Sequence, residues 1–426
     1  MPDGTATAHL YRPKLLTILR EGYAPALFQK DLLAGLTVAI VALPLSMAIA
    51  VASGVSPERG LYTAIVGGFV VSALGGSRFQ IGGPAGAFIV LVAATAAKLG
   101  LEGLLLTVLL SGLMLTLMGV LRLGSLIRHI PHAVTVGFTS GIAVTILASQ
   151  LKDFGGLTLA GAEPGPFFPK LAALSQALPT LNPSALAVGL GSTVLIFVLR
   201  WRRPTWPGML IAVAAASAAV ALLHLPAQTI GTRFGGLPHG LPTPHLPAVS
   251  LALLWKVLPS ALSFTLLGGV ESLLSAKVAD SMTGRKHRSN MELVAQGVAN
   301  MVSALFGGIS VTGTIARTAT NIRAGARTPL SGMMHSAFLL VFILAAADLA
   351  SYVPLAALAG VLVVVCWNMA EKEEFLRLMG YWRESSVLLV TFILTLVEDL
   401  TAGILAGCAL AALYAILKRA VREEGD

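Results

Sequence analysis

The sequence predicts an all-helical protein that crosses a membrane many times. Of its 426 residues, 56% are hydrophobic and 12% are charged. Soluble domains carry about 25% charged residues, and a soluble fold could not bury this much apolar surface with so few charges. The 44 glycines suit closely packed transmembrane helices. This composition excludes a disordered chain, a secreted disulfide-linked scaffold and a nucleic-acid-binding protein.

The apolar runs define fourteen predicted membrane segments. They follow an N-terminal arm, residues 1–31, which has four basic residues and no cleavable signal peptide. Several runs are shorter than the ~20 residues that a helix needs to cross a bilayer, and the third and tenth are the shortest. Residues 152–183 and 225–256, rich in Pro, Gly and His, are predicted to be loops outside the membrane. The segments cover residues 32–52, 60–75, 84–97, 103–121, 131–151, 184–199, 207–224, 257–280, 291–306, 314–323, 328–347, 353–370, 385–398 and 400–418.

The positive charges give these segments a direction. With the N-terminus in the cytoplasm, 21 Lys and Arg residues fall in inside loops and six in outside loops. Cytoplasmic loops of membrane proteins carry such an excess. The net charge of +9 therefore indicates orientation in the membrane rather than a nucleic-acid partner. Both termini are predicted to be cytoplasmic, and residues 419–426 form a cytoplasmic tail after the transmembrane region, 32–418.

Two glycine-rich breaks predict an internal repeat of seven plus seven segments. Each has a Gly-Gly pair, four or five residues that can run extended, and a glycine before a helix start, at residues 75–85 and 307–314. Pro84 suits the first position of a helix because it lacks an N–H, and Thr312 or Thr314 can cap the other helix. Because seven is odd, the two repeats are inverted. The third and tenth segments are then short half-helices with facing N-termini.

Facing half-helix N-termini near the middle of the membrane favour an anion. Unpaired backbone N–H groups and the positive ends of two helix dipoles meet there. In inverted repeats, paired short segments are the best sequence indication of a transporter binding site. Two ordinary glycine-rich loops with short packed helices are the alternative. The substrate-binding residues predicted at the helix starts are Ala85, Gly86, Ala87, Thr314, Ile315, Ala316 and Arg317.

Two charged residues lie inside predicted spans. Glu271 lies in the middle of segment 257–280, and Arg317 lies one turn into the tenth segment. An ionised side chain at the bilayer centre costs at least ~2.5–3.5 kcal/mol, so such residues usually mark a pathway for substrate or protons. A buried pair that only joins two spans is the alternative. We expect Glu271 to offset Arg317 while the site is empty and to bind a proton when an anion competes for Arg317.

Three polar residues on neighbouring segments are predicted to support the site. They are Ser275, Gln296 and Asn300. Gln296 and Asn300, four residues apart, share one helix face and either join helices through hydrogen bonds or orient Glu271. The sequence has no HExxH spacing and no P-loop, and its Gly-Gly-Pro-Ala-Gly-Ala run lacks the strand–helix context of a dinucleotide site. We therefore predict neither an enzyme, nor a metal site, nor a cofactor.

Several long motifs resemble the SulP family of anion transporters, the sulfate permeases of solute carrier family 26. The similar stretches are 31–39, 43–48, 60–63, 278–293 and 313–328. The strongest is Gly-Thr-Ile-Ala-Arg-Thr-Ala-Thr-Asn at 313–321. The resemblance implies a fold like that of uracil permease, with a mobile core of spans 1–4 and 8–11 and a gate of spans 5–7 and 12–14. The substrate then lies between the starts of spans three and ten, near Pro44 and Leu45 of span one.

The chain departs from the family pattern at two places. Family members usually continue into a cytoplasmic STAS domain, whereas this sequence stops at Asp426, so we expect a member or a fragment without that domain. Many members also have Gln where Leu45 stands, which leaves fewer side-chain donors for a small oxyanion. The family further implies a multi-pass protein of the bacterial inner membrane, in contact with the lipid bilayer, and suggests a homodimer.

Shorter stretches at 75–79, 137–141 and 366–369 are similar to the DauA-type branch of C4-dicarboxylate carriers. The predicted function is therefore proton-coupled symport of a fumarate- or succinate-like dicarboxylate by alternating access. The partners are the small anion and protons, with Glu271 as the proton-coupling residue. Sulfate or bicarbonate transport and an anion channel remain alternatives. A fixed guanidinium at Arg317 disfavours coupling to Na⁺.

Overall fold

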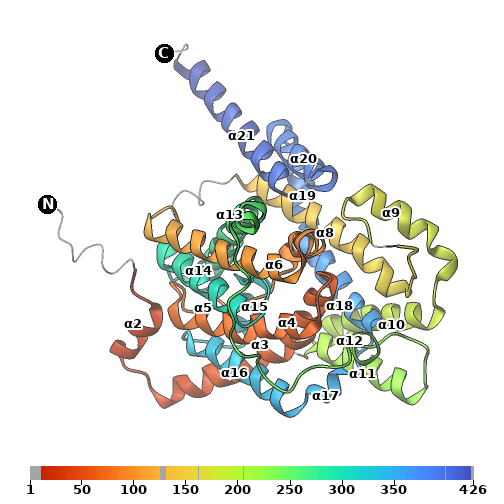
Figure 1. The fold of residues 1–426 in the computed structure, drawn as a ribbon. Coiled ribbons are helices and arrows are strands. Elements are labelled where there is room, and N and C mark those ends of the chain that lie inside the picture. The colour runs from red at the N-terminus through yellow and green to blue at the C-terminus, as the bar shows by residue number, and fades with distance from the viewer. Residues whose placement is uncertain (1–10, 125–130, 162, 205, 399, 424–426) are drawn as a thin grey trace.

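The chain folds as one helical assembly with a single pair of short strands in its described part (Figure 1). The computed structural model describes residues 11–124, 131–161, 163–204, 206–398 and 400–423. The α-helices are α2 (Lys14–Glu21), α3 (Pro25–Ala52), α4 (Pro57–Tyr62), α5 (Gly68–Leu74), α6 (Ile89–Val120), α8 (His132–Gly155), α9 (Phe167–Gln176), α10 (Pro183–Arg202), α11 (Gly208–Leu222), α12 (Ile230–Phe234), α13 (Leu251–Thr283), α14 (Ser289–Leu305), α15 (Ile315–Arg323), α16 (Leu330–Ala345), α17 (Ala347–Ala350), α18 (Leu355–Met369), α19 (Lys372–Met379), α20 (Trp382–Val397) and α21 (Leu400–Glu423). The remaining elements are the π-helix η2 (Thr63–Gly67), the 3₁₀ turns η3 (Gly86–Phe88) and η4 (Leu178–Thr180), and the strands β1 (Gly82–Gly83) and β2 (Thr312–Gly313).

Each predicted apolar segment corresponds to a helix or to consecutive short helices. The second segment is divided into α4, η2 and α5. The third and fourth are continuous in α6 except at Gly100, whose φ of 69° breaks the helix between them. Within the described residues, six helices are long and apolar enough to cross a membrane, and three shorter apolar helices accompany them. The all-helical fold is confirmed, and the count of fourteen crossings stays a prediction.

Several predicted boundaries differ from the observed ones. Helix α3 begins at Pro25 rather than near Leu32, because Pro25 sits in the first turn, where no N–H is needed, and the polar residues that follow continue the helix. One of these, Asp31, is fully buried and accepts hydrogen bonds from Tyr23 Oη and from the backbone and side chain of Thr328. The two predicted loops contain α9, η4 and α12. Hydropathy locates the apolar part of a helix, whereas hydrogen bonding determines its ends.

Helices from the two halves of the sequence pack against each other. Helix α3 packs along α16, and α6 packs along α14 and α13. Glycines allow these close approaches: a Cβ at Gly112 would lie 2.6 Å from the carbonyl oxygen of Gly297, and one at Gly35 would lie 2.5 Å from that of Ser331. A second group forms around α8, which contacts α18 and α20. The division into a mobile core and a gate remains a prediction of the family resemblance.

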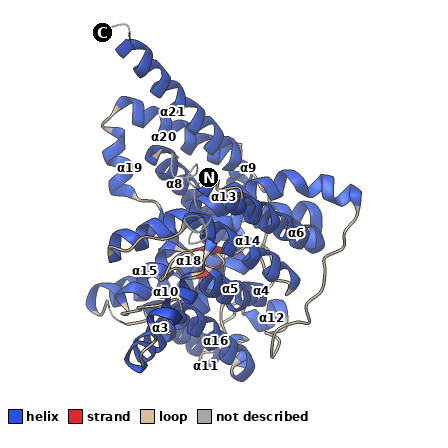
Figure 2. Cartoon of the chain, turned by 90° about the vertical axis from the view of Figure 1, so that its left-hand side faces the viewer, coloured by secondary structure: helices blue, strands red, loops and turns tan. Residues whose placement is uncertain are grey.

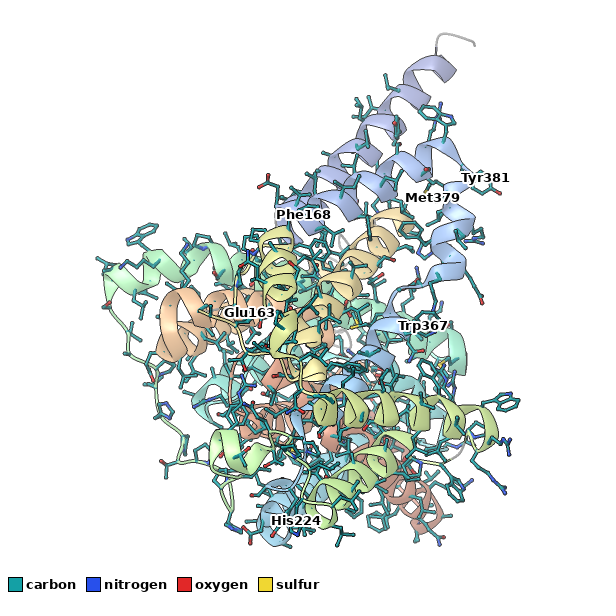
Figure 3. All side chains as sticks on the ribbon, turned by 90° about the vertical axis from the view of Figure 1, so that its right-hand side faces the viewer. Glu163, Phe168, His224, Trp367, Met379 and Tyr381 are labelled. Atoms are coloured by element: carbon teal, nitrogen blue, oxygen red, sulfur yellow. The ribbon has the colours of Figure 1, made fainter. Side chains whose placement is uncertain are left out.

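Helices α20 and α21 project from the rest of the assembly (Figure 1). Figure 3 labels four large side chains that point outward from this side of the molecule, Phe168, Trp367, Met379 and Tyr381. They are 41–63% exposed. A surface with so many exposed apolar side chains is typical of a protein that faces lipid. The two strands lie inside the helical assembly, near its centre (Figure 2).

Candidate functional site

Two extended segments cross in the interior, at the glycine-rich breaks that the sequence singles out. Strands β1 and β2 pair in antiparallel fashion, with Gly82 opposite Gly313 and Gly83 opposite Thr312. All four residues are buried. A Cβ at Gly313 would overlap the side-chain amide of Gln80, and one at Gly83 would overlap the guanidinium of Arg317. A larger residue at either position would force the buried side chain of Gln80 or Arg317 to move, because both approach the backbone directly.

A helix begins on each side of this crossing. Residues 86–88 form η3, which continues into α6, and α15 begins at Ile315. Ala85 and Thr314 precede the two helices in extended conformation. The first N–H groups of each helix have no partner within the helix, and the antiparallel crossing directs both N-termini towards the strand pair. The structure thus brings the predicted helix-start residues to one place.

The expected caps at these helix starts are wrong in detail. Pro84 precedes the helix instead of occupying its first position, because Ala85 is the extended residue before η3. The side chain of neither threonine caps α15: Thr314 Oγ1 donates to the carbonyl oxygen of Ile81 at 3.4 Å, and Thr312 Oγ1 pairs with Ser272 Oγ at 2.8 Å. Tertiary partners compete successfully for both hydroxyls, and the N-terminus of α15 stays uncapped.

Arg317 is the charged residue of this site. Its side chain is 1% exposed. Nη2 donates to Ser46 Oγ at 3.1 Å and to the carbonyl oxygen of Pro84 at 3.2 Å. Within the described part of the chain, Nε and Nη1 have no hydrogen-bond partner, and no acidic side chain forms an ion pair with this guanidinium. A buried guanidinium with two free donors is well suited to bind an oxyanion.

Glu271 does not pair with Arg317, contrary to the expectation for the empty site. It lies partly exposed on α13, and in the ranges that the structure covers it makes no hydrogen bond or ion pair. Its neighbour Ser272 reaches the strand crossing: the Ser272 carbonyl oxygen accepts from Gln80 Nε2 at 3.1 Å. Adjacent residues on a helix point in different directions, so Ser272 contacts the strands while Glu271 faces elsewhere.

Of the three predicted supporting residues, Ser275 and Asn300 stabilise the region of the strand crossing, and none of the three has a hydrogen bond to Glu271 in the described structure. Ser275 Oγ lies 3.2 Å from Thr318 Oγ1. Asn300 holds the second extended segment, since its Nδ2 donates to the Val311 carbonyl oxygen at 2.7 Å and its Oδ1 accepts from Val311 N at 2.9 Å. Gln296 donates to Glu292 Oε1 at 3.1 Å. The interpretation of Gln296 and Asn300 as residues that join elements fits these contacts better than a role in orienting Glu271.

Pro44 and Leu45 lie buried within α3, beside the residue that contacts Arg317. Pro44 removes one backbone donor from the helix. Ser46, which the sequence analysis did not select, supplies the hydrogen bond to the guanidinium. Its only sequence signal is a hydroxyl within an otherwise apolar run.

Sequence reasoning also missed three other polar residues of this region. Gln80 and Thr318 bridge the extended segments to neighbouring helices. His335, on α16, is fully buried, and neither ring nitrogen has a partner among the described residues. Each of these residues is a polar position in a mostly apolar stretch. Gln80 bonds Ser272, 192 residues away, and Thr318 bonds Ile81, 237 residues away, so local sequence does not reveal these partners.

A separate cavity of about 650 Å³ opens elsewhere, among α8, α10, α12 and α18. Its lining includes Lys152, Asp153, Asn182 and Arg233, and it contains none of the predicted site residues. Arg233 Nη1 forms an ion pair with Asp153 at 3.0 Å. No cluster of His, Cys, Asp or Glu suited to a metal ion occurs in the residues that the structure describes.

Comparisons with known proteins agree with this architecture. A model of the sulfate permease family matches residues 28–395. The chain is 44% identical over 399 residues to the putative sulfate transporter YvdB of Bacillus subtilis, covering 93% of this chain and 75% of that protein. It is 31% identical over 389 residues to the bicarbonate transporter BicA of Picosynechococcus, covering 88% of this chain and 68% of that protein.

Two solved structures share the fold. The transmembrane domain of a cyanobacterial bicarbonate transporter BicA superimposes with a TM-score of 0.80 at 33% identity, covering 88% of this chain and 97% of that one. Murine Slc26a9, an anion transporter in the inward-facing state, superimposes with a TM-score of 0.87 at 21% identity, covering 98% of this chain and 73% of that one. The chain belongs to the sulfate permease (SulP/SLC26) family of multi-pass membrane anion transporters.

Proposed function

We propose that this chain is a secondary active carrier that moves a small oxyanion by alternating access. The observation that carries the proposal is the guanidinium of Arg317, which is buried, lacks an ion-pair partner in the described residues and has Nε and Nη1 unoccupied. Nε and Nη1 lie on different edges of the guanidinium, so each can donate to a separate oxygen of a carboxylate or of sulfate, and the positive charge strengthens both hydrogen bonds. The uncapped start of α15 and the start of η3 add backbone N–H groups and the positive ends of two helices.

The substrate we propose is a C4-dicarboxylate, on the similarity of residues 75–79, 137–141 and 366–369 to the DauA-type branch. The relatives give a specific reason for a second candidate. A protein 44% identical to this chain is named a putative sulfate transporter, and others at 31–32% identity are named bicarbonate transporters. All three anions present oxygens to Arg317, so the substrate has to be decided by competition.

Proton coupling through Glu271 belongs to the same proposal. Because no ion pair joins Glu271 to Arg317 in the described residues, the carboxylate does not act as the resting counter-ion of the site. Glu271 is next to Ser272, which bonds Gln80 just before β1 and Thr312 in β2, and this position supports a different link between the carboxylate and the site. When the strand crossing and α13 move together, the exposure of Glu271 changes with them, and a proton can enter from one side and leave on the other. Cytoplasmic termini and a homodimer are further parts of this proposal.

The test is uptake of labelled fumarate, sulfate and bicarbonate into proteoliposomes, with and without an inward proton gradient. We expect saturable uptake of fumarate that the gradient stimulates and that unlabelled sulfate does not block. Uptake of sulfate or bicarbonate without uptake of fumarate would contradict the dicarboxylate and identify that anion as the substrate. Counterflow, in which unlabelled anion inside the vesicles drives entry of labelled anion, distinguishes a carrier from a channel. Large uncoupled currents without counterflow would contradict the carrier.

A further inference from the structure

Three segments that are far apart in the sequence meet at one edge of the assembly. Lys14 N donates to the Gly75 carbonyl oxygen at 3.0 Å, and Arg288 N donates to that of Gly76 at 3.0 Å. The side chain of Arg288 joins its own segment to the N-terminal segment, because its Nη1 donates to the carbonyl oxygen of Arg12 at 2.5 Å. Helix α2 therefore packs beside α5, at the left edge of Figure 1, next to the loop that enters α14.

This junction gathers more positive than negative charge. Glu21 forms an ion pair with Arg78 at 3.0 Å. Asp280 accepts hydrogen bonds from the backbone and ring nitrogens of His287 at 3.1 and 2.7 Å. A third acid, Glu292, is buried beside them and accepts hydrogen bonds from Gly76 N and Ser77 N at 2.8 and 3.0 Å. These three acids do not balance the five cations around them. The five cations, named here the basic cluster, are Arg12, Lys14, Arg78, Arg285 and Arg288.

Two members of the basic cluster have unused donors. In residues 11–124 and the other described ranges, Nζ of Lys14 makes no hydrogen bond or ion pair, and Nε of Arg12 is buried without a partner. Burial and the charges of Arg288 and Arg78 lower the pKa of Lys14 from its ordinary value. An anion with several oxygens that binds among these cations offsets the repulsion between their like charges and accepts hydrogen bonds from the free donors.

The outer face of α2 is apolar. Leu16 and Leu19, three residues apart on one helix face, are 47% and 56% exposed, whereas Ile18 is buried against the protein. Phe28, near the start of α3, is 41% exposed on the same stretch of chain. Leucines next to unbalanced cations are typical of a helix that lies in the membrane interface, with its apolar face among acyl chains and its cations at the headgroups.

We propose that the basic cluster binds the phosphate of an anionic phospholipid in the cytoplasmic leaflet. The phosphate would lie between Lys14 and Arg285, and Leu16 and Leu19 would contact the acyl chains. The positive-inside distribution of Lys and Arg places this edge on the cytoplasmic side, where anionic lipids attract basic segments. The site is distinct from the anion site at Arg317 and does not depend on which anion the protein carries.

The test is calorimetric titration of the detergent-solubilised full chain with dioctanoyl phosphatidylglycerol, dioctanoyl phosphatidylcholine and inorganic phosphate, with empty micelles as the blank. We expect binding of phosphatidylglycerol and none of phosphatidylcholine. The double substitution Lys14→Ala with Arg285→Ala should weaken binding of phosphatidylglycerol by about fivefold for each cation, or about 25-fold for the pair. Phosphatidylglycerol binding that this variant leaves unchanged would overturn the proposal.

A matched control is Arg202→Ala with Arg203→Ala, which removes two exposed cations at the C-terminal end of α10, away from α2. It should change the affinity for phosphatidylglycerol by less than about twofold, and an equal loss there would show unspecific attraction to net charge. Inorganic phosphate that binds as tightly as phosphatidylglycerol and competes with it would assign the cluster to a free anion instead. Lys14→Arg keeps the charge and should retain binding, which separates loss of charge from misfolding of the double variant.

Discussion

Nη2 of Arg317 donates a hydrogen bond to the carbonyl oxygen of Pro84, 3.2 Å away. The two residues belong to opposite repeats: Arg317 lies in α15, and Pro84 lies just before η3. One nitrogen of the guanidinium thus fixes the half-helix starts relative to each other, while Nε and Nη1 remain available in the described structure. The residue that organises the crossing is also the residue we propose to bind the anion.

The crossing requires a glycine at position 313. Gly313→Ala should place a methyl group on the side-chain amide of Gln80 and break its 3.1 Å hydrogen bond to the carbonyl oxygen of Ser272. We expect a loss of about 1–3 kcal/mol in the free energy of unfolding and a lower apparent melting temperature in detergent. The control is Gly191→Ala, because a Cβ at Gly191 meets no atom within 4 Å. Equal melting temperatures for the two variants would show that the crossing is looser than described.

Asn300 should stabilise the fold by holding the second extended segment through the backbone of Val311. In Asn300→Ala, the buried N–H and carbonyl oxygen of Val311 lose the partners at 2.9 and 2.7 Å. Each buried group left unpaired costs about 1–3 kcal/mol, so we expect a clear fall in melting temperature and reduced uptake. Asn368→Ala removes an exposed asparagine that bonds Arg200 and should have little effect. A mild phenotype for Asn300→Ala would contradict the role assigned to this side chain.

Glu271→Gln tests proton coupling separately from anion binding. The amide cannot take up a proton, so uptake should lose its stimulation by an inward proton gradient. Since Glu271 makes no contact with Arg317 in the described residues, the KM for the anion at fixed pH should change by less than about threefold. Glu384→Gln, at an exposed position on α20, is the control. Gradient-stimulated uptake that persists in Glu271→Gln would remove the proton-coupling role.

Much of this fold could be predicted because its signals are local. Apolar runs locate the helices, and the paired Gly-Gly breaks locate both extended segments and the helix starts behind them. Local sequence could not give the partners of Arg317. Ser46 lies 271 residues away along the chain. It directly follows the selected Pro44 and Leu45, but a hydroxyl in an apolar run does not identify a guanidinium as its partner. Pairing Glu271 with Arg317 assumed that opposite buried charges meet, whereas Ser46 and Pro84 satisfy one nitrogen and leave the others free.

The helix ends show the same limit. Thr312 and Thr314 have the residue type of a helix cap, yet Ser272 and Ile81 bind their hydroxyls. Choosing between a local cap and a tertiary partner requires the three-dimensional arrangement of α13 and β1. Residues 1–10 and 424–426, which belong to the predicted cytoplasmic arm and tail, lie outside the described residues.

Anion binding by Arg317 is tested by the KM for uptake of the transported anion in the wild type, Arg317→Ala and Arg317→Lys. A charge-assisted hydrogen bond contributes about 1.5–3 kcal/mol, so Arg317→Ala should raise the KM by about 10- to 150-fold. Arg317→Lys should give an intermediate value, because it keeps the charge but lacks the several fixed N–H donors of the guanidinium. Melting temperatures of all three proteins show whether the crossing survives the loss of the bond to Pro84. A KM for folded Arg317→Ala equal to that of the wild type would show that Arg317 does not bind the anion and would assign anion binding to the helix N-termini alone.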